Sequence, residues 1–164
     1  MSRPRRTRPK ETKASSRASV LVLSGPNLQL LGTREPGIYG RETLTEIHAR
    51  VAERGLELGV DIEAFQSNHE GDLLDRIGNA PAEGFSGLLL NAGAYTHTSL
   101  ALYDAIRAVG LPCVEVHLSN PEAREEYRHV SRVAPACIGK VAGFGGDSYV
   151  LGLEGLVRWL AARK

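Results

Sequence analysis

The stretch Leu88–Ser99, which reads LLLNAGAYTHTS, decides the fold. Its three leucines lead directly to Asn91. Three small residues come next, and polar residues then continue to Ser99. Such a run, ending in polar groups before a new helix, is typical of a buried strand in a parallel sheet. Ligands of open α/β sheets lie outside the carboxyl ends of the strands. The stretch therefore predicts a pocket with Asn91, His97 and Ser99 at its mouth, unless Thr98 or Ser99 serves only as a helix N-cap.

Outward from this stretch, apolar runs alternate with helical patterns. The expected strands are 19–24, 60–66, 88–90, 113–116 and 137–144, and the expected helices are 43–59, 72–79, 98–109, 121–128 and 149–162. Thr43 and Glu46 predict a capping box at the start of the first helix. Gly and Pro interrupt residues 28–40, so we expect a long loop of the kind that is usually a functional lid or disordered. This order predicts a flavodoxin-like α/β fold, with a doubly wound, five-stranded parallel sheet in a three-layer α/β/α sandwich.

Length and charge divide the chain into two parts. The 164 residues suit one domain, which we place at 19–164. Residues 1–18 hold seven Lys or Arg and one acidic residue, and they lack an apolar pattern, which predicts a disordered basic tail. A transit peptide or a weak anionic tether is the alternative. The remainder carries a net charge of −5, which argues against a nucleic-acid-binding domain.

The cysteines and the hydropathy of the chain indicate the cellular compartment in which the protein acts. Cys113 and Cys137 both lie in apolar runs, which favours buried free thiols in a reducing compartment. No apolar stretch is long enough to span a membrane. We therefore expect a cytoplasmic protein that acts without a membrane.

Polar residues follow three of the expected strands and predict the chemistry of the pocket. Asn27 follows the first strand, Asn91 and His97 the third, and His117 and Ser119 the fourth. The histidines are not spaced as metal ligands, and the chain lacks a Walker loop, a Rossmann glycine motif and a nucleophile elbow. Such a set suits proton transfer on a hydroxylated, anionic metabolite. The plainer interpretation is that these histidines belong to ordinary turns.

Four runs now carry a specific resemblance. SGPNLQLLGTREPGIYG, FQSNHEGDLLDRI, NAGAYTHTSLALYDAI and VEVHLSNPEAREEYR resemble the type II 3-dehydroquinate dehydratases, in order and spacing, from residue 20 to about 160. The resemblance implies a flavodoxin-like hydro-lyase without metal or cofactor, assembled as a dodecamer of trimers. Such an enzyme removes water from 3-dehydroquinate with anti stereochemistry, through an enolate. The product, 3-dehydroshikimate, belongs to the shikimate pathway of aromatic amino acid biosynthesis or to quinate catabolism.

The resemblance also implies five catalytic residues. Tyr39 matches the base that takes a proton next to the ketone, and Arg34 matches the residue that lowers the pKa of that tyrosine. A free tyrosine titrates near 10, so a phenolate at neutral pH needs a nearby cation. Asn27 matches the residue that orients a water against the enolate oxygen. His117 matches the general acid for the departing hydroxyl, and Glu115 would orient His117.

Six further positions match substrate-binding residues of that family. Leu118 and Ser119 match the pair that binds the substrate carboxylate. Asn91, His97 and Arg128 match groups that bind ring hydroxyls. Asp104 matches an aspartate that reaches the site of a neighbouring subunit. Tyr103 stands where the family often has arginine, which leaves some subunit contacts open.

Other classes share the expected fold. A flavin carrier needs a phosphate loop rich in Ser, Thr and Gly after the first strand, and GPNLQLLG does not supply one. A phosphorelay receiver needs an aspartate where Asn91 stands. A non-catalytic binding module stays open, because every pocket residue could bind a small molecule without reacting.

Overall fold

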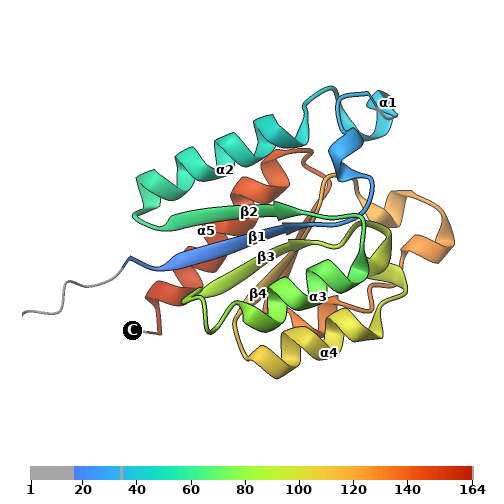
Figure 1. The fold of residues 1–164 in the computed structure, drawn as a ribbon. Helices are drawn as coiled ribbons and strands as arrows, with labels where there is room; N and C mark the ends of the chain where they lie inside the picture. Colours follow the sequence, from blue (N-terminus) through green and yellow to red (C-terminus); the bar gives the residue numbers. More distant parts are fainter. Residues whose placement is uncertain (1–16, 34, 164) are drawn as a thin grey trace, which may run out of the picture.

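The computed structural model describes residues 17–33 and 35–163, and it contains a five-stranded parallel sheet (Figure 1). The strand order is β2-β1-β3-β4-β5. The strands are β1 Ser19–Ser24, β2 Asp61–Gln66, β3 Gly87–Asn91, β4 Cys113–His117 and β5 Gly139–Ala142. This is the flavodoxin-like order, so the predicted sheet is confirmed.

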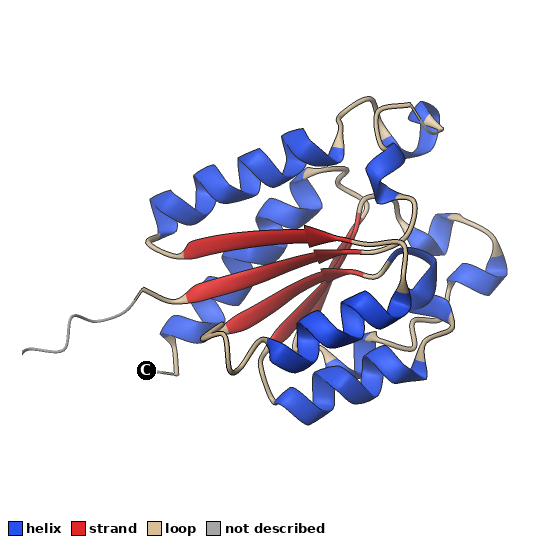
Figure 2. Cartoon of the chain, in the orientation of Figure 1, coloured by secondary structure: helices blue, strands red, loops and turns tan. Residues whose placement is uncertain are grey.

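Helices cover both faces of the sheet and complete three layers (Figure 2). Helices α2, Leu44–Leu58, and α5, Asp147–Ala161, lie on one face, whereas α3, Glu70–Asn79, and α4, Leu100–Val109, lie on the other. The side chains of β1 alternate accordingly. Val20 and Val22 pack with α2 and α5, and Leu21 and Leu23 pack on the opposite face. The sheet is therefore buried on both sides, as its nearly continuous apolar runs require.

The ends of α2 follow from local chemistry that was visible in the sequence. Thr43 accepts a hydrogen bond from the Glu46 backbone, and the Glu46 side chain accepts one from the Thr43 backbone at 2.8 Å. Gly59 ends the helix with a left-handed backbone (φ 72°), which glycine adopts without steric cost. The predicted capping box is confirmed.

The topology opens a crevice beside β1. The chain leaves β1 for β2 through α2 on one face, and it returns from β2 to β3 through α3 on the other. Ser24 of β1 stands opposite Asn91 of β3, so both strands end at the same level. The connections that follow them lead to helices on opposite faces of the sheet, α2 after β1 and α4 after β3, and such a place is where open sheets bind ligands.

The connection from β4 to β5 differs from the prediction. The helix expected over 121–128 is instead two separate 3-10 turns, Pro121–Ala123 and Glu126–Arg128. The backbones of Arg124 and Glu125 are extended between them (ψ −164° and 143°), and this interrupts the helical hydrogen bonds. A third 3-10 turn, Ala134–Ala136, precedes β5.

Several predicted boundaries also need correction. The fifth strand is Gly139–Ala142 rather than 137–144, because Cys137 closes a 3-10 turn and Gly143 turns left-handed (φ 95°). Helix α4 begins at Leu100, and α5 begins at Asp147. Ser99 is the N-cap of α4, since its hydroxyl accepts from the Leu102 backbone at 2.9 Å.

The expected loop 28–40 contains some helical structure. Leu28–Leu30 forms a 3-10 turn, and Pro36–Tyr39 forms the four-residue helix α1. Residues 1–16 of the predicted tail lie outside the described residues. Among those that are described, no helix is long and apolar enough to cross a bilayer. Both cysteines are free thiols, with Cys113 buried as expected and Cys137 half-buried.

Candidate functional site

A cavity lies over the carboxyl ends of the central strands. Its walls come from the loops after β1, β3 and β4, and its volume is about 710 Å³, including space open to solvent. It brings together seven of the residues singled out from the sequence, namely Asn27, Asn91, His97, His117, Leu118, Ser119 and Arg128. These residues are 101 positions apart at most in sequence, and the parallel sheet unites them.

Four other predicted site residues are not among the described residues that line the cavity. Glu115 lies behind His117, fully buried in β4. Asp104 is exposed on α4 and does not line the cavity. Arg34 lies outside the described residues, and Tyr39 ends α1 with a side chain that is likewise outside the description.

Glu115 and His117 form a hydrogen-bonded pair in which His117 lines the cavity and Glu115 lies buried next to it. The two residues are two apart in β4 and therefore point to the same face of the sheet. His117 Nε2 lies 2.7 Å from Glu115 Oε1. Because a carboxylate only accepts hydrogen bonds, Nε2 carries the proton of this bond, and Nδ1 is the ring nitrogen left for a ligand.

Ser131 supports this pair and was not singled out from the sequence. Its hydroxyl donates to Glu115 Oε1 at 2.8 Å and accepts from the backbones of Val133 and Ala134 at 3.2 and 2.9 Å. The Glu115 carboxylate is thus held from the loop before β5. Little in the sequence indicates this role of Ser131, because Ser131 lies 16 residues beyond Glu115 in a segment without hydrophobic periodicity.

His97 presents a defined ring nitrogen to the cavity. Its Nδ1 lies 2.8 Å from the Val130 carbonyl oxygen, which can only accept, so Nδ1 carries a hydrogen. In the neutral ring, Nε2 is then a hydrogen-bond acceptor. This tautomer suits a ligand hydroxyl that donates.

The loop that carries Asn27 is fixed by its neighbours. Asn27 has a left-handed backbone (φ 67°), a conformation that asparagine tolerates better than most residues. Its N–H donates to Asn68 Oδ1 at 3.0 Å, and the Asn68 carbonyl accepts from the Tyr95 hydroxyl at 2.7 Å. Asn68 therefore ties together the loops after β1, β2 and β3, a role that its sequence position did not reveal.

Two guanidinium groups give the cavity its positive charge. The side chains of Arg124 and Arg128 line it, and both approach Glu125 Oε2, at 3.4 and 2.9 Å. The Glu125 backbone N–H, followed by Arg128, lowers the pKa of the Glu125 carboxyl to about 2. Arg124 also lies 3.5 Å from the Ser119 hydroxyl. The sequence predicted a binding role for Arg128 but not for Arg124, and both line the cavity, one on each side of the break between the two 3-10 turns.

The arrangement can bind an anion and transfer a proton to it. The arginines and Ser119 supply donors for a carboxylate. His117, held by Glu115, supplies an acid–base group. Across residues 17–33 and 35–163, no three His, Cys, Asp or Glu side chains cluster as metal ligands do.

Comparison with known proteins gives a consistent result. The family model described as dehydroquinase class II matches residues 18–157. A 3-dehydroquinate dehydratase of a Nostoc species is 58% identical over 142 residues, which cover 87% of this chain and 96% of that protein. One of Rhizobium johnstonii is 56% identical over 138 residues, which cover 84% and 94%. The crystal structure of a type II dehydroquinase from Butyrivibrio crossotus matches with a TM-score of 0.84 at 40% identity, covering 86% of this chain and 98% of that one.

Proposed function

The chain belongs to the class II dehydroquinase family, and we propose that its cavity converts 3-dehydroquinate to 3-dehydroshikimate by anti elimination of water through an enolate. The family and the names of its relatives support a hydro-lyase of the shikimate pathway. The observation that carries the mechanism is the buried Glu115–His117 pair in the wall of a cationic cavity.

The first step is removal of a proton from the carbon next to the ketone. The family resemblance assigns Tyr39 as the base and Arg34 as the residue that keeps the phenol of Tyr39 ionised. Both residues belong to the segment between β1 and α2, which follows the Asn27 loop. The electron pair of the broken C–H bond moves onto the ketone oxygen and forms an enolate. A water oriented by Asn27 donates a hydrogen bond to that oxygen.

The second step expels the hydroxyl group. The enolate collapses, the C–O bond breaks, and the leaving oxygen takes a proton from His117 Nδ1. The Glu115 carboxylate stabilises the doubly protonated ring beforehand, because it accepts from Nε2 at 2.7 Å. Water leaves, and the proton on Tyr39 returns to solvent while His117 is protonated again.

The remaining cavity residues hold the substrate. Ser119 and the Leu118 backbone bind the carboxylate. Asn91, His97 and Arg128 bind ring hydroxyls. All five line the same cavity, which supports a shared role in binding one small, hydroxylated anion.

Assembly and compartment belong to the same proposal. Asp104 is exposed on α4 outside the cavity of its own chain, which suits a residue that serves a neighbour's site. The protein assembles as a dodecamer of trimers and acts in the cytoplasm, without metal, cofactor, nucleic acid or membrane. Residues 19–164 form the single catalytic domain.

Adding 3-dehydroquinate to the purified protein and following enone absorbance tests the activity. We expect absorbance to rise, and we expect His117→Ala to slow the rise by 10²- to 10⁴-fold, the usual effect of losing a general acid. His69→Ala is the matched control, because His69 is exposed before α3 and away from the cavity. Tight binding without an absorbance change would contradict the proposal and identify a binding module.

A further inference from the structure

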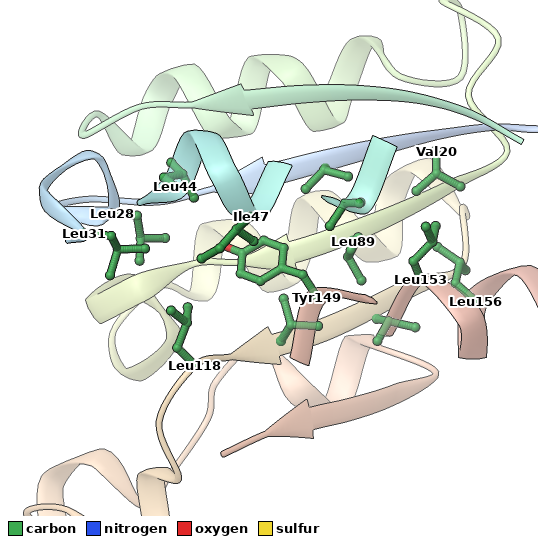
Figure 3. Close-up of a cluster of buried hydrophobic side chains, with 14 of the residues drawn as sticks. Val20, Leu28, Leu31, Leu44, Ile47, Leu89, Leu118, Tyr149, Leu153 and Leu156 are labelled. Carbon is green, nitrogen blue, oxygen red and sulfur yellow. The ribbon is translucent and has the colours of Figure 1, made fainter. Parts of the chain in front are cut away.

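Glu115 brings a carboxylate into an apolar layer of the protein. Its neighbours in β4, Val114 and Val116, belong to the apolar cluster between the sheet and helices α2 and α5 (Figure 3). Because side chains alternate along a strand, Glu115 and His117 point to the opposite face, where Cys113 is buried with residues of α3 and α4. A carboxylate that is completely buried among such residues is costly unless hydrogen bonds hold it.

The donors that reach this carboxylate converge on one of its oxygens. His117 Nε2 lies 2.7 Å from Oε1, and the Ser131 hydroxyl lies 2.8 Å from the same atom. The other oxygen, Oε2, is buried without a hydrogen-bond partner among the described residues. Lys140 is in register with Glu115 on β5, but its ammonium lies 3.4 Å from Glu122 Oε1 instead. Ser131 is therefore the one partner besides His117 that the described part of the chain gives this carboxylate.

The contacts of Ser131 fix the direction of its hydrogen. A serine hydroxyl has one hydrogen to donate and two lone pairs that accept. The backbone N–H groups of Val133 and Ala134 both donate to the Ser131 oxygen, at 3.2 and 2.9 Å. The Val133 side chain is completely buried in the core, so the turn that holds the hydroxyl is itself anchored. The single hydrogen of Ser131 is thus left for Glu115.

The same turn also orients the second histidine of the cavity. The carbonyl of Val130, directly before Ser131, accepts from His97 Nδ1 at 2.8 Å. Arg132, directly after Ser131, donates its backbone N–H to the Thr96 carbonyl at 2.8 Å. The turn is therefore bound to the loop after β3 on both sides of Ser131. Ligand binding at His97 consequently reports whether the turn has kept its place.

We propose that Ser131 is a positioning residue for the acid step: its hydroxyl holds the Glu115 carboxylate with Oε1 toward His117, and the ring keeps Nδ1 directed at the leaving hydroxyl. This rests on the role proposed above for His117. Without the hydroxyl, the N–H groups of Val133 and Ala134 lose this acceptor. The carboxylate is then free to turn about its terminal bond toward these donors, and the ring of His117 loses its fixed partner.

The test compares chemistry with binding in the wild type and in Ser131→Ala. Quinate keeps the carboxylate and ring hydroxyls of the substrate but has no ketone, so it binds without eliminating water. Calorimetry gives its Kd, and enone absorbance gives kcat for 3-dehydroquinate. We expect kcat to fall by about 10- to 100-fold, the range found when an outer partner of a metal-bound histidine is removed. The Kd of quinate should stay within about twofold, because the contact of His97 with Val130 remains.

Deuterium exchange separates the acid step from proton abstraction. In D₂O, slower expulsion of the hydroxyl gives the enolate more time to return to substrate, which then takes up deuterium at the carbon next to the ketone. Mass spectrometry of recovered 3-dehydroquinate, corrected for exchange without enzyme, should show more deuterium per product formed with Ser131→Ala than with the wild type. A lower kcat with an unchanged ratio of exchange to product would overturn the inference, because both steps would then be disturbed alike.

Ser67→Ala is the matched control. Like Ser131, Ser67 donates to a carboxylate, that of Asp72 at 2.6 Å, and accepts from a backbone N–H, that of His69 at 2.9 Å, but it does not line the cavity. Its kcat should stay within about twofold of the wild type. Ser131→Thr keeps the hydroxyl and should restore most of the lost kcat. A threonine variant that binds quinate normally but is as slow as Ser131→Ala would contradict the role of the hydroxyl.

Two further variants complete the test. Because Ser131 acts through Glu115, adding Ser131→Ala to Glu115→Ala should change kcat by less than about twofold, and equal losses in both backgrounds would show a merely structural role. Should Ser131→Ala fail to fold, Ser131→Cys keeps the shape but donates only weakly, so its kcat should fall below that of the wild type. A wild-type kcat in Ser131→Cys would contradict the inference. Failure of the proposed reaction itself would show differently, as a wild type that forms no enone.

Discussion

At the scale of single residues, the cavity works through side chains whose donors and acceptors are fixed by a second contact. His117 is held by Glu115, His97 by the Val130 carbonyl, and Asn91 by Gly93. Each contact leaves one defined atom for the ligand. Such fixed groups reduce the reorganisation needed when charge develops in a reaction.

The base assignment is tested at this scale by Tyr39→Phe. The substitution removes only the phenol oxygen, so we expect kcat to fall by 10²- to 10⁴-fold while quinate binding changes little. Arg34→Ala should shift the rise of activity to higher pH, because a phenolate loses its stabilising cation. Steady-state kinetics from pH 6 to 10 measure both effects. Turnover of Tyr39→Phe within tenfold of the wild type would remove Tyr39 as the base.

At the scale of elements, the loops after β1 and β3 meet closely and shape the cavity. Gly25 N donates to the Asn91 carbonyl at 2.7 Å, and a Cβ at position 25 would lie 2.5 Å from the Ala92 carbonyl oxygen. The contact involves backbone on both sides, so neither can move cheaply. Glycine is therefore required where these two strand ends approach.

Gly25→Ala should separate the two loops and weaken both stability and binding. We expect the free energy of unfolding to fall by about 1–3 kcal/mol, as for other overpacked sites, and KM to rise. Gly71→Ala is the matched control, because a Cβ there meets nothing within 4 Å. Urea unfolding and kinetics measure the two effects, and an unchanged KM in Gly25→Ala would show that the close approach does not shape the cavity.

Elements with strong local signals could be predicted, and those that depend on distant contacts could not. The cap at Thr43 and the glycine at Gly59 placed α2 within a residue, and the apolar runs located β1 and β3. The segment after β4 lacks such signals, since its two 3-10 turns are separated by an extended pair of residues. Ser131 and Asn68 were missed for a related reason: their partners are brought close only by the folded sheet.

At the scale of the whole molecule, buried polar groups couple stability to pH. Burial lowers the pKa of His48, so below the unfolded value near 6.5 the unfolded state binds more protons than the folded state. Stability is present above that pH and is lost as pH falls through the folded pKa. Urea midpoints at pH 7.5 and 5.5 should therefore differ less in His48→Gln than in the wild type. Equal differences would contradict the effect.

Assembly is a second property of the whole molecule. If Asp104 serves a neighbour's site, turnover requires an oligomer, and Asp104→Ala should raise KM without altering the fold of its own subunit. Light scattering should return a dodecamer. Deletion of residues 2–16, which keeps the contacts of Arg17 and Ala18 with Asp61, should change neither the number of subunits nor the turnover, because that segment has no apolar pattern to pack. A fully active monomer would contradict the trimeric assembly.

The central claim is direct proton abstraction without a covalent imine, and borohydride trapping tests it most directly. A Schiff base needs a desolvated lysine near the ketone. Of the chain's four lysines, Lys140 alone falls within the described residues, where it lies in β5 and pairs with Glu122 at 3.4 Å rather than lining the cavity. Borohydride added during turnover should leave the protein active and its intact mass unchanged. A stable substrate adduct on a lysine, found by mass spectrometry, would contradict the mechanism.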